Sequence, residues 1–265
     1  MMRGTRLDGR LAVVTGGGGA IGAAVCADLV ALGAHVIVAD VRQDAAAKVV
    51  EGLALAHPWV VDPGGTAWSE DQGKAEAREV DLADPARITR FAEAAGPVDI
   101  LVHNAGVTVV EPFTESDPAS WDLMWQVNLR APMLLTKLLL PGMVERGWGR
   151  LVFVSSDGAR AGSGGEGAYA ATKAGLFGLA KTLAREAAKG GVTSNVVCPG
   201  PTDTPMLRRI EADKPGLVER IVRNIPLRRL GTPDDVAGLV AYLCTERAAY
   251  ITGQTLSVSG GVTMQ

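Results

Sequence analysis

Tyr169 and Lys173 lie four residues apart in the stretch 168–188, whose pattern predicts a helix. This spacing places both side chains on one face of that helix, one turn apart. A free tyrosine has a pKa of about 10, which is too high for an efficient base at neutral pH. A neighbouring ammonium group favours the phenolate and lowers that pKa. The pair is therefore a candidate for acid–base catalysis, and the alternative is a chance pair on a solvated helix face.

Ser156 supplies a second hydroxyl group at a useful place in the chain. It follows an apolar run at residues 151–154, which predicts a strand, and it precedes Tyr169 by 13 residues. A hydroxyl at the end of this strand can form a hydrogen bond with the oxygen of a bound substrate.

A glycine-rich turn indicates a dinucleotide site. The apolar run at 11–14 leads directly into Thr-Gly-Gly-Gly-Gly-Ala-Ile-Gly at 15–22, and a helical pattern begins at Ile21. Glycines allow a tight turn and close approach of backbone N–H groups to phosphate, and the helix N-terminus adds donors and a positive dipole. A merely flexible turn is the alternative. The residues expected to contact the cofactor here are Gly16, Gly18, Gly19, Ile21 and Gly22.

Asp40 ends the second predicted strand, at 36–39, and lies 24 residues after Gly16. An acidic residue at about this separation accepts hydrogen bonds from the adenosine ribose and repels a 2′-phosphate, which favours NAD over NADP. A cap on the strand or on the next helix is the structural alternative. Arg42 could meet a 2′-phosphate if Asp40 turned away, so it is the residue that would permit NADP.

The composition excludes several classes of partner. The chain has 265 residues, 47% hydrophobic and 21% charged, with a formal net charge of −3 and 5% aromatic residues. It can bury a sizeable core, and it has neither the basic surface nor the aromatic platform of a nucleic-acid or anionic-membrane binder. Three widely spaced cysteines favour a reducing compartment, and no signal peptide or membrane-spanning run is evident. We expect a cytoplasmic protein with no metal site.

Short apolar runs alternate with longer helical patterns along the whole chain. This alternation predicts an α/β fold, a single Rossmann-type doubly wound parallel sheet with helices on both faces, formed by one domain spanning residues 1–265. The Pro-, Gly- and charge-rich segment 57–74 is expected to be a loop insertion at the surface.

The chain resembles the short-chain dehydrogenase/reductase family from about Leu7 to Gly261. Six ordered stretches carry the resemblance. They are the glycine turn at 15–22, His103-Asn104-Ala105-Gly106, Trp121-Asp122 with Val127-Asn128-Leu129, Ser155-Ser156 with Tyr169-Ala170-Ala171-Thr172-Lys173, Asn195 with residues 199–204, and residues 251–254 with Gly260-Gly261.

The resemblance implies a role for each matched residue. Tyr169 is the general acid/base, Ser156 orients the substrate oxygen, and Lys173 holds the nicotinamide ribose and lowers the tyrosine pKa. Asn128 keeps a water in a proton relay towards Lys173. Gly19, where NADP-using relatives often carry Lys or Arg, again supports NAD. The other expected cofactor contacts are Asp81 and Leu82 at the adenine, Asn104, Ala105 and Gly106 along the cofactor, Pro199, Gly200 and Thr202 beside the nicotinamide, and Thr204 at its carboxamide.

Three positions depart from the family pattern without removing a catalytic group. Ala20 replaces the middle glycine of the turn, His103 replaces the first Asn of Asn-Asn-Ala-Gly, and Ser259 replaces a common Asp. Ala20 and His103 bear on cofactor affinity, and we interpret His103 as a hydrogen-bonding residue at a strand end.

The segment 204–226 is expected to be a lid over the substrate. Its apolar residues are spaced as one side of a helix, and Arg208 and Arg209 lie on a solvated face or meet an acidic substrate tail. Residues 162–166, 198–204 and 256–261 resemble 2-hydroxycyclohexanecarboxyl-CoA dehydrogenases, which implies a cyclic or 3-hydroxyacyl thioester. The apolar residues of the segment are Met206, Leu207, Ile210, Leu217 and Ile221.

The prediction is an NAD-dependent enzyme that moves a hydride between the cofactor and a secondary alcohol or ketone. Within the family, a 3-oxoacyl-thioester reductase and a sugar or polyol dehydrogenase are alternatives. A non-catalytic NAD-binding regulator and a structural subunit are alternatives from other classes. The helices predicted around 123–143 and 168–188 are expected to pair subunits into a homotetramer.

Overall fold

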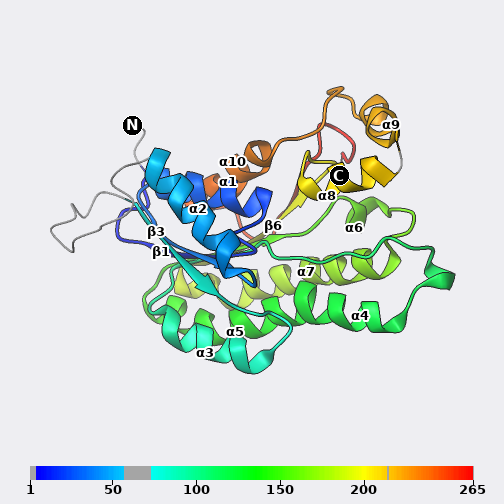
Figure 1. The fold of residues 1–265 in the computed structure, drawn as a ribbon. Coiled ribbons are helices and arrows are strands. Elements are labelled where there is room, and N and C mark those ends of the chain that lie inside the picture. The colour runs from blue at the N-terminus through cyan, green and yellow to red at the C-terminus, as the bar shows by residue number, and fades with distance from the viewer. Residues whose placement is uncertain (1–3, 57–72, 214, 265) are drawn as a thin grey trace.

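A seven-stranded parallel sheet forms the centre of the molecule (Figure 1). The structure is a computed structural model that describes residues 4–56, 73–213 and 215–264. The strands lie in the order β3-β2-β1-β4-β5-β6-β7. Their bounds are β1 (Leu11–Thr15), β2 (His35–Asp40), β3 (Lys74–Glu79), β4 (Ile100–His103), β5 (Gly149–Val154), β6 (Val192–Pro199) and β7 (Thr255–Val258). The predicted fold class is confirmed.

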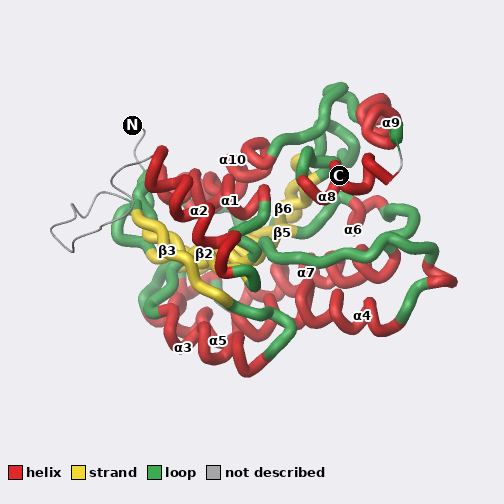
Figure 2. Tube along the Cα trace, viewed as in Figure 1, coloured by secondary structure: helices red, strands yellow, loops and turns green. Residues whose placement is uncertain are grey.

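Helices cover both faces of the sheet (Figure 2). One face carries α1 (Ala20–Ala31), α2 (Gln43–Ala56) and α10 (Pro233–Cys244), and the other carries α3 (Pro85–Ala95), α5 (Ala131–Glu145) and α7 (Gly167–Glu186). The remaining helical segments are η1 (Phe113–Glu115), α4 (Pro118–Trp125), η2 (Gln126–Arg130), α6 (Gly158–Ala161), η3 (Ala188–Gly190), α8 (Pro205–Asp213), α9 (Leu217–Asn224) and η4 (Glu246–Ala248). No helix in the described ranges is long and apolar enough to cross a bilayer.

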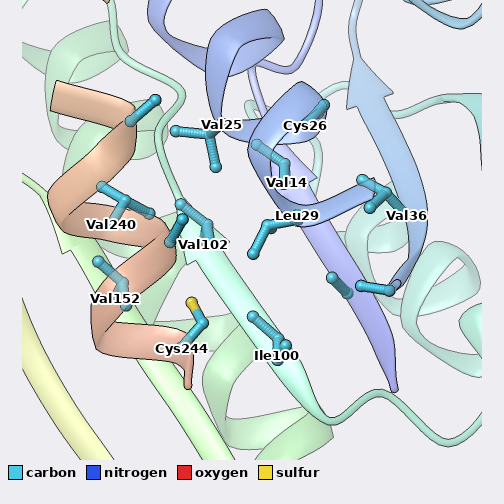
Figure 3. Packing of buried hydrophobic residues seen from close by; sticks show 14 of the residues in the cluster. Val14, Val25, Cys26, Leu29, Val36, Ile100, Val102, Val152, Val240 and Cys244 are labelled. Carbon is cyan, nitrogen blue, oxygen red and sulfur yellow. The ribbon is translucent and has the colours of Figure 1, made fainter. Parts of the chain in front are cut away.

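The two layers of helices explain why the strands are apolar without alternation. Val14 of β1 faces Leu29 of α1 and Val240 of α10, and Figure 3 shows these side chains meeting Val102 of β4 and Val152 of β5. The neighbouring Val13 belongs to the cluster on the opposite face of the sheet. Because both faces are covered, the strands β4, β5 and β6 in the middle of the sheet are buried at every residue.

The strand order changes direction between β1 and β4, which marks the expected position of a ligand crevice. β1 pairs with both β2 and β4, so the connections leaving β1 and β4 run to opposite sides. Ligands of open α/β sheets bind outside the carboxyl ends of the strands at such a point. The loops that follow β1 to β6 therefore surround the expected site.

Three segments differ from the predictions or lie partly outside the description. The predicted loop 57–74 lies outside the described residues except for Gly73 and Lys74, and Lys74 already begins β3. The lid was predicted as one helical face but is two helices, α8 and α9, because Pro215 and Gly216 interrupt it. Gly216 has a φ of 80°, which a continuing helix does not allow. Between α4 and α5 the predicted helix contains a π-helical turn, η2.

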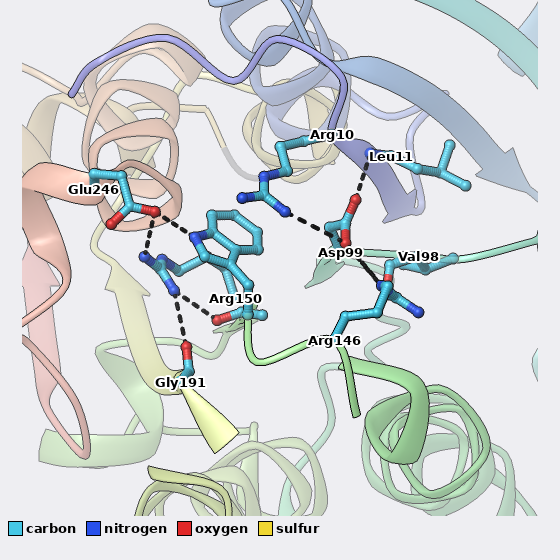
Figure 4. A network of polar contacts seen from close by, with 10 residues as sticks. Arg10, Leu11, Val98, Asp99, Arg146, Arg150, Gly191 and Glu246 are labelled. Atoms are coloured by element: carbon cyan, nitrogen blue, oxygen red, sulfur yellow. Dashed lines mark hydrogen bonds and ion pairs between the residues drawn. The ribbon is translucent and has the colours of Figure 1, made fainter. Parts of the chain in front are cut away.

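A polar network joins the amino ends of the strands, opposite the crevice (Figure 4). Asp99, just before β4, accepts a hydrogen bond from the N–H of Leu11 in β1 at 3.2 Å and from Arg146 at 3.3 Å. Arg150 of β5 is 2% exposed and lies 3.4 Å from a carboxylate oxygen of Glu246. The ring of Trp148 lies 3.8 Å from the guanidinium of Arg10 and 4.2 Å from that of Arg150.

Candidate active site

The predicted site residues lie along the carboxyl edge of the sheet and on two helices beside it. Gly16 to Gly22 follow β1, Asp40 ends β2, and Asp81 and Leu82 follow β3. The other strands contribute Asn104, Ala105 and Gly106 after β4, Ser156 after β5, and Pro199 to Thr204 at the end of β6. Asn128 lies in η2, and Tyr169 and Lys173 lie in the first two turns of α7.

The glycine turn is held by the loop after β4. Gly16 has a φ of 64°, and a Cβ on it would lie 2.7 Å from the Cα of Ala105. The amide nitrogen of Asn104 donates to the carbonyl oxygens of Thr15 at 3.1 Å and Gly16 at 3.0 Å. A Cβ on Gly22 would collide with the carbonyl of Gly16. The turn therefore requires glycine at both positions.

The N-terminus of α1 is suited to a pyrophosphate group. Gly19 is the N-cap residue and provides no side chain to bond the first amides of the helix. Those N–H groups remain available, and the helix dipole favours a negative charge beside them. Ala20 occupies the first turn of α1 without disturbing it. The turn and the helix end fit the pyrophosphate of a dinucleotide.

Asp40 is 9% exposed and both of its carboxylate oxygens accept hydrogen bonds. The N–H of Gly18 donates to one oxygen at 3.0 Å, and the N–H of Arg42 donates to the other at 3.0 Å. These bonds direct the negative charge towards the glycine turn. At the end of β3, the carboxylate of Asp81 accepts from the N–H of Ala83 at 2.9 Å, beside half-buried Leu82.

Asn128 joins the loop after β4 to α7. Its Oδ1 accepts from the N–H of Val107 at 2.8 Å, and its Nδ2 donates to the carbonyl of Val107 at 2.9 Å and to Thr172 Oγ1 at 3.1 Å. The side chain is fully buried and lies in the π-helical turn η2. Single π turns occur frequently at functional sites.

Lys173 is 3% exposed, and its ammonium lies one helical turn beyond Tyr169 in α7. Nζ donates to the carbonyl of Val154, the last residue of β5, at 2.9 Å. A Cβ on Gly106 would lie 3.0 Å from this nitrogen, so glycine leaves room for it. Burial lowers the pKa of Lys173 to about 8, which still leaves most of the ammonium protonated at neutral pH.

Ser156 lies close enough to Tyr169 to lower the pKa of the tyrosine, and the N–H of Gly158 donates to Ser156 Oγ at 3.1 Å. The prediction that Lys173 lowers the tyrosine pKa is wrong for the protein alone. Burial, the largest cause, and the negative charge of Glu166 together raise the pKa of Tyr169 to about 12. Lys173 Nζ lies 6.0 Å from the ring centroid of Tyr169 and bonds elsewhere. At neutral pH the hydroxyl is therefore protonated and is placed to give a proton to a bound ketone oxygen.

His103 is a structural residue, as predicted. Its Nε2 lies 2.8 Å from Thr136 Oγ1, and its ring stacks on Phe153 with centroids 4.8 Å apart. Burial and the charge of Lys173 lower its pKa to about 3, so the imidazole is neutral.

The segment after β6 is tightly fixed as far as Thr204. A Cβ on Gly200 would lie 2.8 Å from the Cα of Ser259, and Thr202 Oγ1 donates to the Gly200 carbonyl at 2.9 Å. Thr204 Oγ1 accepts from the N–H of Leu207 at 3.4 Å at the start of α8. Arg208 of α8 forms two hydrogen bonds with Asp203, at 2.7 and 2.9 Å, and is exposed.

Three residues of the site were not among the predicted ones. Thr15 Oγ1 accepts from the N–H groups of Asn104 at 3.2 Å and Ala105 at 3.3 Å. Thr172 supports Asn128, and Glu166 lies close to Tyr169. All three lie inside stretches that carry a resemblance to known enzymes, at 15–22, 169–173 and 162–166, so their positions were a usable signal.

Comparisons with known proteins agree with the geometry. A family model described as enoyl-(acyl carrier protein) reductase matches residues 18–263. An acetoacetyl-CoA reductase of Rhizobium meliloti is 39% identical over 255 residues, covering 95% of this chain and 98% of the relative. A 2,3-dihydroxy-2,3-dihydro-p-cumate dehydrogenase of Pseudomonas putida is 36% identical over 258 residues, covering 97% and 96%. A solved 3-oxoacyl-(acyl-carrier-protein) reductase of Agrobacterium tumefaciens, with NADP bound, has a TM-score of 0.87 at 31% identity and covers 97% and 95%.

The depressed pKa of Lys173 predicts a specific dependence of stability on pH. Its ordinary pKa is 10.5, and its pKa in the folded protein is about 8. Below pH 8 the lysine is protonated in both the folded and the unfolded state, and the folded state bears the cost of burying the charge. Between these values the unfolded chain binds more protons, and the free energy of unfolding therefore rises with pH. We compare the wild-type protein with Lys173→Met by urea titration, without cofactor. Between pH 7.5 and 10.5, the free energy of unfolding of the wild type should rise by up to about 3 kcal/mol more than that of the variant.

Lys181→Met is the matched control, since Lys181 is exposed on the same helix. It should keep the wild-type dependence on pH. Parallel stability curves for wild type and Lys173→Met would show that the ammonium bears no such cost.

Proposed function

The chain belongs to the short-chain dehydrogenase/reductase family of oxidoreductases, and we propose that it transfers a hydride between NAD(H) and a secondary alcohol or ketone. The observation that carries the proposal is the grouping of three side chains, with Ser156 close enough to Tyr169 to lower its pKa and the buried ammonium of Lys173 at 6.0 Å from the tyrosine ring centroid. A nicotinamide cofactor supplies or accepts the hydride when bound.

The side chains of this chain manage the proton. In ketone reduction, Ser156 and Tyr169 hydrogen-bond the carbonyl oxygen, and the tyrosine gives its proton to that oxygen as the carbon receives hydride. In alcohol oxidation the proton returns to the tyrosine. Lys173 remains charged and holds the ribose hydroxyls, while Asn128 fixes the loop that lines the cofactor. A complete set of four such groups argues against the non-catalytic regulator.

Asp40 supports NAD as the cofactor. Its charge lies beside Gly18 at the turn, where a 2′-phosphate would meet a buried carboxylate. Arg42 contributes only its backbone N–H to this arrangement. The solved relative with NADP bound shows that a protein of this fold can hold NADP, so the proposed preference for NAD rests on these residues of this chain.

Two substrate classes are supported by relatives. The acetoacetyl-CoA reductase and the short motifs at 162–166, 198–204 and 256–261 favour a cyclic or 3-hydroxyacyl thioester. The dihydrodiol dehydrogenase favours a substrate with neighbouring hydroxyl groups. The lid, residues 204–226 in the single domain 1–265, covers the crevice in either case. The three cysteines are free and buried, which supports a cytoplasmic enzyme.

The cofactor preference is tested by binding. Wild-type protein should bind NAD(H) at least about tenfold more tightly than NADP(H), a difference of about 1.4 kcal/mol, because like charges repel at Asp40. In titration calorimetry, Asp40→Ala should reduce the difference between the affinities for NAD(H) and NADP(H). Asp44→Ala removes the same charge from the exposed side of α2 and should leave the preference unchanged. Equal affinities in the wild type would contradict the assignment of NAD.

The reaction itself is tested by Tyr169→Phe. The variant should lower kcat for ketone reduction by about 10²- to 10⁴-fold and leave NADH binding within about twofold, because only the acid is removed. Tyr250→Phe, at a fully exposed tyrosine, is the control. Because the proton donor must be protonated, reduction should slow as pH rises through the apparent pKa of the site, while alcohol oxidation accelerates. Near-wild-type turnover by Tyr169→Phe would refute the mechanism.

A groove along α5 and α7 supports the proposal of a homotetramer. It has a volume of about 660 Å³ and is lined mainly by apolar side chains, among them Met133, Leu140, Leu179 and Leu183. A second copy of the chain would cover these residues about a twofold axis. Light scattering at micromolar concentration should give the mass of four chains, and Met133→Glu should reduce it. A monomeric wild-type protein would exclude this assembly.

A further inference from the structure

Glu166 places a negative charge beside the two catalytic hydroxyls. It precedes α7 and lies three residues before Tyr169. Its Oε2 lies 3.3 Å from the position that a Cβ on Gly158 would take, and Ser156 Oγ lies 3.4 Å from the same position. The carboxylate and the serine hydroxyl therefore border the same small space. The negative charge of the carboxylate also raises the pKa of Tyr169.

No structural role accounts for this carboxylate. Glu166 is the N-cap residue of α7, but its side chain makes no capping hydrogen bond. Only its backbone takes part in the local structure. Its N–H donates to the carbonyl of Ser163 at 3.1 Å, and its carbonyl accepts from the N–H of Ala170 at 2.7 Å. Across residues 4–56, 73–213 and 215–264, no cation pairs with its carboxylate. The helix dipole favours a negative charge at this end, which is the only stabilisation evident.

A partly buried carboxylate without a donor lacks hydrogen bonds that a ligand can supply. The ligand nearest to it is the substrate, because the reacting oxygen lies at Ser156 and Tyr169. A hydroxyl on the neighbouring carbon would reach Glu166 while the reacting oxygen stays on the serine. A carboxylate at that carbon would be repelled, and the methylene of a 3-oxoacyl thioester offers no adequate donor.

We propose that Glu166 determines the substrate class, by accepting a hydrogen bond from a second hydroxyl group beside the reacting carbon. The substrate is then a vicinal diol, or the corresponding hydroxyketone, rather than a 3-oxoacyl thioester. This inference rests on the proposed function, because it takes Ser156 and Tyr169 as the pair that holds the reacting oxygen.

The test compares matched alcohols with wild-type protein, Glu166→Gln and Glu93→Gln. Glu93 is exposed on α3, so its variant removes the same charge far from the site. Wild type and Glu93→Gln should oxidise cis-1,2-cyclohexanediol with a kcat/KM about 10- to 100-fold above that for cyclohexanol, the range expected for a hydrogen bond to a charged acceptor. In Glu166→Gln, the ratio of kcat/KM for the diol to kcat/KM for cyclohexanol should fall about tenfold, because the amide is a weaker acceptor. The same variant should have a higher kcat/KM than the wild type for 2-hydroxycyclohexanecarboxylate, and it should bind NADH as tightly as the wild type does.

A second readout separates failure of this inference from failure of the proposed function. Binding of cis-1,2-cyclohexanediol and cyclohexanol to NAD-loaded protein is measured by calorimetry, independently of turnover. Diol binding that depends on Glu166 without any turnover would sink the proposed reaction and leave the assignment of Glu166 intact. Equal kcat/KM or equal binding for the two alcohols, no binding of either, or a preference of the wild type for 3-hydroxybutyryl-CoA over the diol would overturn the assignment.

Discussion

The pairing of β1 with β4 is the constraint on which the site depends. It places Thr15 opposite His103, so that the loops leaving the two strands meet at the carboxyl edge. Thr15 Oγ1 accepts from the N–H groups of Asn104 and Ala105, and the Asn104 amide donates back to the carbonyls of Thr15 and Gly16. These bonds join the dinucleotide turn to the loop that Asn128 holds against α7. The proposed cofactor turn and the proposed proton-transfer residues therefore depend on one set of hydrogen bonds between side chains and backbone.

Much of the fold was predictable because both faces of the sheet are covered. Strands such as 11–14 and 151–154 are continuous apolar runs, and this pattern identifies buried parallel strands directly. The break between α8 and α9 was readable in principle from Pro215 and Gly216, but the apolar spacing across them concealed it. The π-helical turn at Asn128 had no signal, because one additional residue in a helical turn leaves composition and spacing nearly unchanged.

The site was predictable in its members and not in its electrostatics. Ser156, Tyr169 and Lys173 follow from motif spacing, and the structure brings them together. The sign of the tyrosine pKa shift does not follow from spacing, because it depends on burial and on Glu166. Sequence separation also suggested that Lys173 acts on Tyr169, whereas in the fold its nearest acceptor is the Val154 carbonyl. In a buried site, the distance to the nearest partner and the loss of solvent determine a pKa more than position along a helix does.

The polar network around Trp148, Arg150 and Asp99 lies at the opposite end of the strands from the crevice (Figure 4). It links the amino ends of β1, β4 and β5 without using any residue of the carboxyl-edge loops. The two ends of the sheet can therefore change independently over evolutionary time. Lineages could replace lid and loop residues, and so acquire new substrates, while the opposite end preserves the register of the sheet. For the same reason, directed evolution of this scaffold is best confined to residues 157–168 and 205–226, with the residues of the network left untouched.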